Sequence, residues 1–146
     1  MANGDITCTR LLSESFADVS GNGDTSFVAN YNNSGAGSAF NSQDETITAK
    51  KIGKMVFLTF LELAETMNNA SPRFETTAAP IPAAYRPPTQ VELPAIVADS
   101  VDNYFGRLVI TSSGNIIFRR ALDGTTNFAT GAGGGHRGFT ICYAVA

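Results

Sequence analysis

The longest apolar stretch of the chain, Ala49–Leu63, constrains the fold more than any other segment. It begins with charged residues and a glycine, and from Met55 to Leu61 it is apolar except for one threonine. Both a helix over Lys54–Asn68 and a short strand fit a run of this length. The run lacks the polar face that a surface helix needs and is rich in β-branched and aromatic types. We therefore predict a strand that is apolar on both faces, buried in a core or at a subunit interface.

The composition indicates how the rest of the chain is built. The 146 residues predict one domain, 1–146, and only 16% of them are charged. The polar surface must therefore consist largely of Asn, Ser, Thr and Gly, which suits an all-β extracellular or virion protein. A net charge of −3 argues against nucleic-acid binding, and the absence of 18 consecutive apolar residues argues against membrane insertion. Met1–Asp5 has no signal-peptide character, so we expect release by another route, such as cell lysis.

Turn-bounded segments with strand-like patterns recur along the chain. They predict the strands Ile6–Leu12, Ser26–Tyr31, Thr46–Ile52, the central run, Gly106–Ser112, Ile116–Ala121 and Phe139–Val145. Ala95–Val101 fits either a strand or one helical turn. In the last strand, Phe139, Ile141, Tyr143 and Val145 share one face. Short strands separated by turns predict an antiparallel β-sandwich or barrel.

Three other segments are not expected to form central strands. Asn32–Asn41 and the glycine-rich Thr130–Gly138 predict exposed loops. Five prolines in Phe74–Pro94 exclude both a helix and a central strand there. The apolar side chains of Ile81 and Tyr85 predict that this extended segment packs against the rest of the domain and is not a free linker.

The two cysteines, Cys8 and Cys142, lie near opposite ends of the sequence. They would form a disulfide if the terminal strands were neighbours in an oxidising compartment. The alternative, which we favour, is two buried free thiols, because cysteine is among the most buried residue types. Their number and spacing do not indicate a metal site, and we predict no cofactor.

The order of several motifs resembles a known family. Matching segments are Lys51–Phe60, Ile81–Pro87, Gly106–Phe118 and Phe139–Tyr143. The most specific is Ile-Pro-Ala-Ala-Tyr-Arg-Pro at Ile81–Pro87. In this order the motifs resemble the C-terminal head of bacteriophage tail-fibre and baseplate receptor-binding proteins. The first 45 residues show no such match, and we expect them to continue the head or to form a shoulder.

The resemblance implies a fold, an assembly and a function. It implies a jelly-roll-like antiparallel β-sandwich, a homotrimer, and attachment to saccharides on a host cell surface. It also implies virion localisation and contacts with other tail or fibre proteins. Two alternatives remain: a structural decoration or fibre-tip protein without a ligand, and a small polysaccharide-degrading domain.

His136 and Arg137, within the glycine-rich loop, are the first candidates for saccharide binding. Glycines permit close approach of a ligand, and both side chains donate hydrogen bonds. The alternative is a mobile hairpin tip with solvated side chains. The loop lacks the Gly-Lys-Ser/Thr ending of a phosphate-binding loop.

Two polar groups elsewhere are further candidates. Asp123, Asn127 and Arg119 combine a carboxylate, an amide and a guanidinium, although Asp-Gly is also a turn dipeptide. Asp102 and Tyr104 place a carboxylate beside an aromatic ring that could stack on a sugar. The alternative for Tyr104 is a tyrosine at the edge of the core. We expect Arg86 to be structural, with a fixed carboxylate or carbonyl partner.

The sequence gives little support for catalysis. The chain has one histidine and no Gly-x-Ser-x-Gly elbow, so a serine triad is not indicated. Several acidic residues could serve a glycosidase, but no spacing selects a pair. We therefore predict that the protein is not an enzyme.

Overall fold

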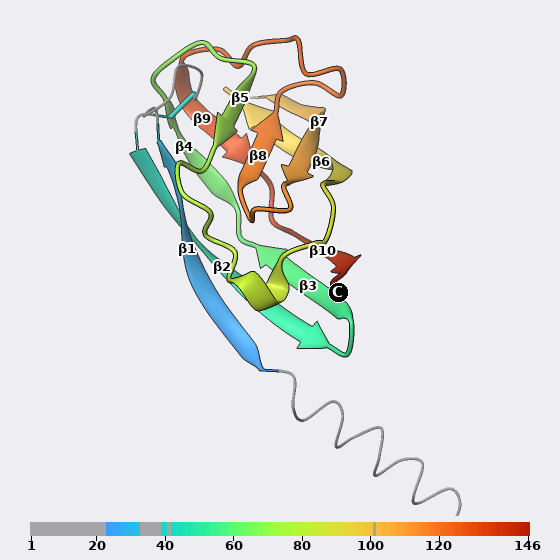
Figure 1. Ribbon diagram of the computed structural model, residues 1–146. Helices are drawn as coiled ribbons and strands as arrows, with labels where there is room; N and C mark the ends of the chain where they lie inside the picture. Colours follow the sequence, from blue (N-terminus) through green and yellow to red (C-terminus); the bar gives the residue numbers. More distant parts are fainter. Residues whose placement is uncertain (1–22, 33–38, 41, 101) are drawn as a thin grey trace, which may run out of the picture.

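A computed structural model describes residues 23–32, 39–40, 42–100 and 102–146 of the chain. These residues form two antiparallel sheets, one with strand order β1-β2-β3-β10 and one with β4-β9-β6-β7-β8-β5 (Figure 1). The strands are β1 Asp24–Asn32, β2 Ser42–Ile52, β3 Met55–Phe60, β4 Leu63–Met67, β5 Arg73–Glu75, β6 Val91–Asp99, β7 Asp102–Ile110, β8 Ile116–Arg119, β9 Gly131–His136 and β10 Phe139–Ala144. The prediction of an all-β antiparallel sandwich is confirmed. The trimer stays a prediction.

The four-stranded sheet is built around β3, the central apolar run. β3 pairs with β2 on one side and with the C-terminal strand β10 on the other. The β2–β3 hairpin turns at Gly53, whose φ of 59° suits a two-residue turn with glycine first. Only one face of β3 enters the core, through Val56, Leu58 and Phe60, whereas Phe57 and Thr59 lie on the outer face. Burial of both faces in the core of one chain is therefore wrong, and burial of the outer face at a subunit interface stays a prediction.

The core between the sheets is rich in aromatic side chains. Phe74 and Phe118 stack at a centroid distance of 4.9 Å, and the ring of His136 stacks on Phe118 at 4.4 Å. Phe60 meets Phe118 edge-on from the four-stranded sheet. Edge-to-face and offset contacts of this kind stabilise aromatic pairs beyond their buried area. On β10, Tyr143 is buried and the other inward positions predicted from the sequence pack on this core.

The proline-rich segment packs against the rest of the domain, as predicted. Ile81 is fully buried, and Tyr85 donates a hydrogen bond to the carbonyl of Gly23 at 2.6 Å. Figure 1 shows the short 3-10 helix η1, Ala83–Tyr85, beside the ends of β2 and β3. Arg86 Nε donates to the carbonyl of Ile81 at 2.8 Å, which confirms its structural role.

Two segments depart from the sequence expectations. The glycine-rich stretch is not a loop: it forms β9, and at Gly134 and Gly135 the paired strand β4 leaves no room for a side chain. A Cβ at Gly135 would lie 2.0 Å from the carbonyl oxygen of Leu63 on the paired strand β4. β6 runs through Pro94 although it lies between two strands. This is tolerated because β9 pairs with β6 only at Val97 and Ala98, so proline's missing N–H breaks no ladder bond.

Some predictions lie outside the described residues. These include the strand Ile6–Leu12, Cys8, and most of the loop Asn32–Asn41. Of that loop, Ala39 and Phe40 are described and are fully buried. Cys142 is exposed on β10 and has no disulfide partner within the described chain, so the expectation that it is buried is wrong.

Candidate functional site

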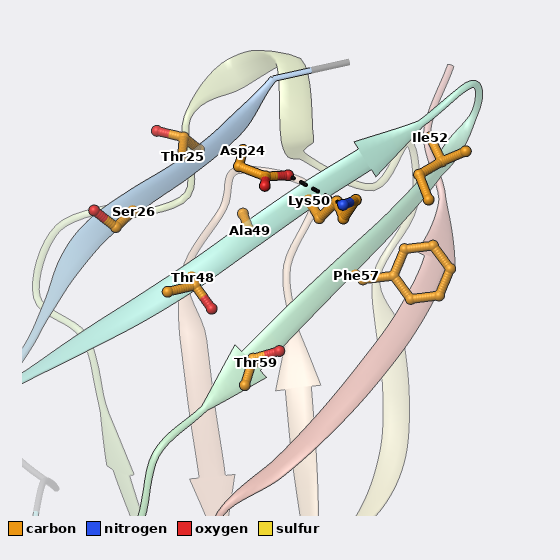
Figure 2. Close-up of a pocket in the computed structure, with 9 residues that line it drawn as sticks. All are labelled: Asp24, Thr25, Ser26, Thr48, Ala49, Lys50, Ile52, Phe57 and Thr59. Atoms are coloured by element: carbon orange, nitrogen blue, oxygen red, sulfur yellow. Dashed lines mark ion pairs between the residues drawn. The ribbon is translucent and has the colours of Figure 1, made fainter. Parts of the chain in front are cut away.

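The outer face of the four-stranded sheet carries a shallow hollow of about 650 Å³ (Figure 2). Its walls come from β1, β2 and β3. The lining residues are Asp24, Thr25, Ser26, Thr48, Ala49, Lys50, Ile52, Phe57 and Thr59. The hollow is open to solvent and both polar and apolar groups reach it.

A row of hydroxyl side chains crosses the sheet at this hollow. Ser26 pairs with Thr48, Thr48 with Thr59, and Thr59 with Thr140, so each of the four strands contributes one member. Because neighbouring strands lie about 4.8 Å apart, the row places polar groups at regular intervals over roughly 15 Å. The hydroxyls of Thr59 and Thr140 are 3.0 Å apart and hydrogen-bonded. Each hydroxyl can both donate and accept, as sugar hydroxyls do.

The adjacent row combines charge with an aromatic ring. Asp24 is opposite Lys50, and Lys50 is opposite Phe57. Lys50 Nζ lies 3.7 Å from Asp24 Oδ1, and both side chains are more than half exposed. Such an exposed pair contributes at most about 1 kcal/mol to stability and can exchange its partner for a ligand. Phe57 is half-buried, and its ring lies on the side of Ile52, at the end of the hollow away from Thr48 and Thr59 (Figure 2).

His136 does not lie in an exposed loop. Its side chain is fully buried on β9, and Nε2 lies 3.1 Å from Glu45 Oε2. Nδ1 is 3.1 Å from the carbonyl oxygen of Arg137, which accepts a hydrogen bond in the tautomer that carries its hydrogen on Nδ1. Tyr31 donates to the same Glu45 oxygen at 2.9 Å, and burial together with Glu45 raises the pKa of Tyr31 well above its usual value. Both interpretations of His136, ligand contact and solvated hairpin tip, are therefore corrected: the residue belongs to a polar network in the core.

Arg137 lies where the chain crosses from β9 to β10 and is partly exposed. Its Nε donates to Asn103 Oδ1 at 2.7 Å, and its Nη1 forms an ion pair with Glu62, at the crossover from β3 to β4. These contacts tie the two crossovers together. Since existing partners engage this guanidinium, it is a weaker candidate for a ligand than the sequence indicated.

Asp102 and Tyr104 belong to β7. Tyr104 donates to Asp102 Oδ2 at 3.2 Å, and the guanidinium carbon of Arg120 lies 3.1 Å from the centre of the Tyr104 ring. Arg120 in turn pairs with the nearly buried Asp99 at 2.8 Å. One face of the ring is therefore covered by Arg120, as expected for the alternative of a core-edge tyrosine.

Asp123 forms the turn that its sequence indicated. Its carboxylate accepts the backbone N–H of Thr125 at 3.0 Å and the Thr125 hydroxyl at 2.9 Å. These hydrogen bonds lower the pKa of the exposed Asp123 carboxyl. Asn127 is exposed, and Arg119 lies on the outer face of the six-stranded sheet.

None of the seven residues selected from the sequence lines the hollow. The residues that do line it were missed because their common location depends on strand register. The available signal was the alternation in β2, where Thr46, Thr48 and Lys50 face outward between buried Ile47 and Ala49. The described residues contain no cluster of three or more His, Cys, Asp or Glu side chains able to hold a metal, and no helix among them is long and apolar enough to cross a membrane. The sequence matches no protein-family model and no curated protein.

Proposed function

We propose that this protein is a non-catalytic, saccharide-binding head of a phage tail fibre or baseplate. The observation that carries the proposal is the hollow on the four-stranded sheet. There three members of the hydroxyl row, the Phe57 ring and the Asp24–Lys50 pair line one open surface. The sequence resemblance to receptor-binding heads supports the virion setting.

The chemistry of the hollow suits a neutral sugar. The apolar face of a pyranose ring packs well on an aromatic ring, while its hydroxyls exchange hydrogen bonds with Ser, Thr, Asp and Lys side chains. Pockets of this kind combine apolar contact with a few fixed polar groups. A glycosidase needs two carboxyl groups on either side of the bond it cleaves. Asp24 is the one carboxylate among the described lining residues, which supports a binder rather than an enzyme.

Glycan-array binding followed by matched variants tests this proposal. We expect Thr48→Val and Phe57→Ala each to weaken binding at least about tenfold, by loss of a hydrogen bond or of ring contact. Thr46→Val is the control, because Thr46 is exposed on the same face and strand but does not line the hollow. Equal binding by all variants would reject the site. Absence of glycan binding would favour a structural virion part, and release of reducing sugars would favour an enzyme.

We also propose that the head is a homotrimer. Phe105 and Ile96 are opposite one another on β7 and β6, and they are 74% and 45% exposed. A subunit contact at this face would remove both side chains from water. Light scattering coupled to gel filtration would give the mass directly, and a monomer would contradict this assembly.

A further inference from the structure

Three arginines form a row on the outer face of the six-stranded sheet. Arg73 on β5 pairs with Arg119 on β8, and Arg119 pairs with Arg107 on β7. The residues next to them, Phe74, Leu108 and Phe118, are buried in the core. Strand alternation therefore directs all three arginines outward, on adjacent strands about 4.8 Å apart.

The charges along this row are unevenly matched. Arg73 pairs with Glu75 at 3.1 Å and Arg107 pairs with Glu92 at 3.0 Å, each at one side of the row. Arg119, in the middle, has no ion pair and no hydrogen bond from its side chain within the described residues. Arg107 is close enough to the Asp123 carboxyl to help lower its pKa. That carboxylate already accepts two hydrogen bonds, from the backbone N–H and the hydroxyl of Thr125.

One N–H group of each of the three arginines also lacks a hydrogen-bond acceptor. The Nε atoms of Arg73, Arg107 and Arg119 are each buried, and each lacks a hydrogen-bond partner. Buried donors are normally paired, and each unpaired one calls for an explanation. The rest of each side chain is only part-buried, so an oxyanion at this face would reach the outer N–H groups of the row rather than the buried Nε atoms.

The turn after β8 holds two of the guanidinium groups side by side. A Cβ on Gly124, whose φ is 74°, would lie 3.0 Å from Arg107 Nη2 and 3.2 Å from Arg119 Nη1. The turn backbone thus packs against both groups at once. Two like charges kept this close favour an anion between or above them.

We propose that Arg119, flanked by Arg73 and Arg107, binds an oxyanion: the carboxylate or phosphate group of an acidic glycan or related polymer. The planar guanidinium fork matches either group through two parallel hydrogen bonds. This site is on the opposite sheet from the hollow and does not depend on saccharide binding there.

Calorimetric titration of the full chain at constant ionic strength tests the proposal, with inorganic phosphate, glucuronate and neutral glucose as probes. We expect phosphate or glucuronate to bind at one site, and the tighter of the two identifies the preferred group. Glucose should not bind at this site. Arg119→Gln should weaken anion binding at least about tenfold, and Arg119→Lys should weaken it less, because the charge remains without the fork.

Lys54→Gln is the matched control, since it removes one exposed cation at the β2–β3 turn, outside both the arginine row and the hollow. Circular dichroism should show that each variant is folded. If Arg119→Gln does not fold, the anion affinity of Arg119→Lys is compared with that of the wild type instead. Anion binding that is equal in wild type, the Arg119 variants and Lys54→Gln would overturn the proposal. So would the absence of binding by both anions. Loss of glycan binding in the Thr48 or Phe57 variants, with anion binding retained, would show that the two sites are separate.

Discussion

The polar network in the core gives the sharpest prediction about stability. Glu45 is 5% exposed, and its Oε2 meets His136 Nε2 and the Tyr31 hydroxyl, both of which are fully buried. Its other oxygen, Oε1, is buried with no partner. The carboxyl group therefore depends on His136 and Tyr31 alone. Removing one member leaves a buried polar or charged group without compensation.

His136→Phe isolates the loss of this partner. Phenylalanine keeps a flat ring that can stack on Phe118, so little packing is lost. We expect the free energy of unfolding to fall by about 3–5 kcal/mol, the usual cost of breaking a buried pair. For a chain of this size that corresponds to a melting temperature lower by roughly 10 °C or more.

A compensated variant tests the cause of the loss. Tyr31→Phe, Glu45→Leu and His136→Phe together leave no polar side-chain group in the network, so stability should return to near the wild-type value or exceed it. Urea unfolding followed by circular dichroism measures each value, with unchanged m-values as the control for folding. The reasoning is refuted if His136→Phe alone costs less than about 1 kcal/mol, a net value typical of an ordinary hydrogen bond. It is also refuted if the triple variant stays as unstable as His136→Phe.

Three further outcomes follow from the structure. Gly135→Ala should destabilise the protein by at least about 2 kcal/mol, since its Cβ would meet the Leu63 carbonyl, whereas Gly131→Ala, with open space around it, should cost less in the same urea assay. The raised pKa of Tyr31 means that the folded state keeps a proton that the unfolded chain releases near pH 10. Unfolding free energy should therefore fall above that pH by up to about 1.4 kcal/mol per unit for Tyr31 and as much again for Tyr143, whose pKa is also raised by burial. The slope from pH 9 to 11 should be smaller in Tyr31→Phe, and equal slopes in that variant and the wild type would contradict this. If Phe105 forms the trimer contact, Phe105→Ser should reduce the mass measured by light scattering to that of a monomer, and an unchanged mass would exclude the contact.

The strands with clear alternation were predictable from the sequence. β10 was the most clearly predictable strand. Every second residue in it is apolar and faces inward, and a glycine directly before it marks where the strand begins. The hairpin of β7 and β8 was equally clear from its Ser-Gly-Asn turn. Alternation is a local property, so each strand could be recognised without knowledge of its neighbours.

β9 could not be predicted in this way, because its sequence carries no strand preference. Glycine is depleted in strands, and Gly131–His136 contains four of them. The reason for them lies on β4: the space that a side chain on Gly134 would fill is occupied by Met67. A requirement set by another strand leaves no periodic signal in the segment itself. The same holds for the pairing of Glu45 with His136, which are 91 positions apart.

The core network and the outer-face hollow are connected through the register of β2. Glu45 points inward toward His136, so Thr46 and Thr48 must point outward. A slip of one residue would expose the inward side chains of β2 and bury its threonines. It would also take Glu45 away from both of its partners, at the cost estimated above for a broken buried pair. Apolar side chains alone specify a face, but a hydrogen-bonded carboxylate specifies a position along the strand. The buried network thereby fixes Thr48 between Ser26 and Thr59, and with it the hydroxyl row on which saccharide binding would depend.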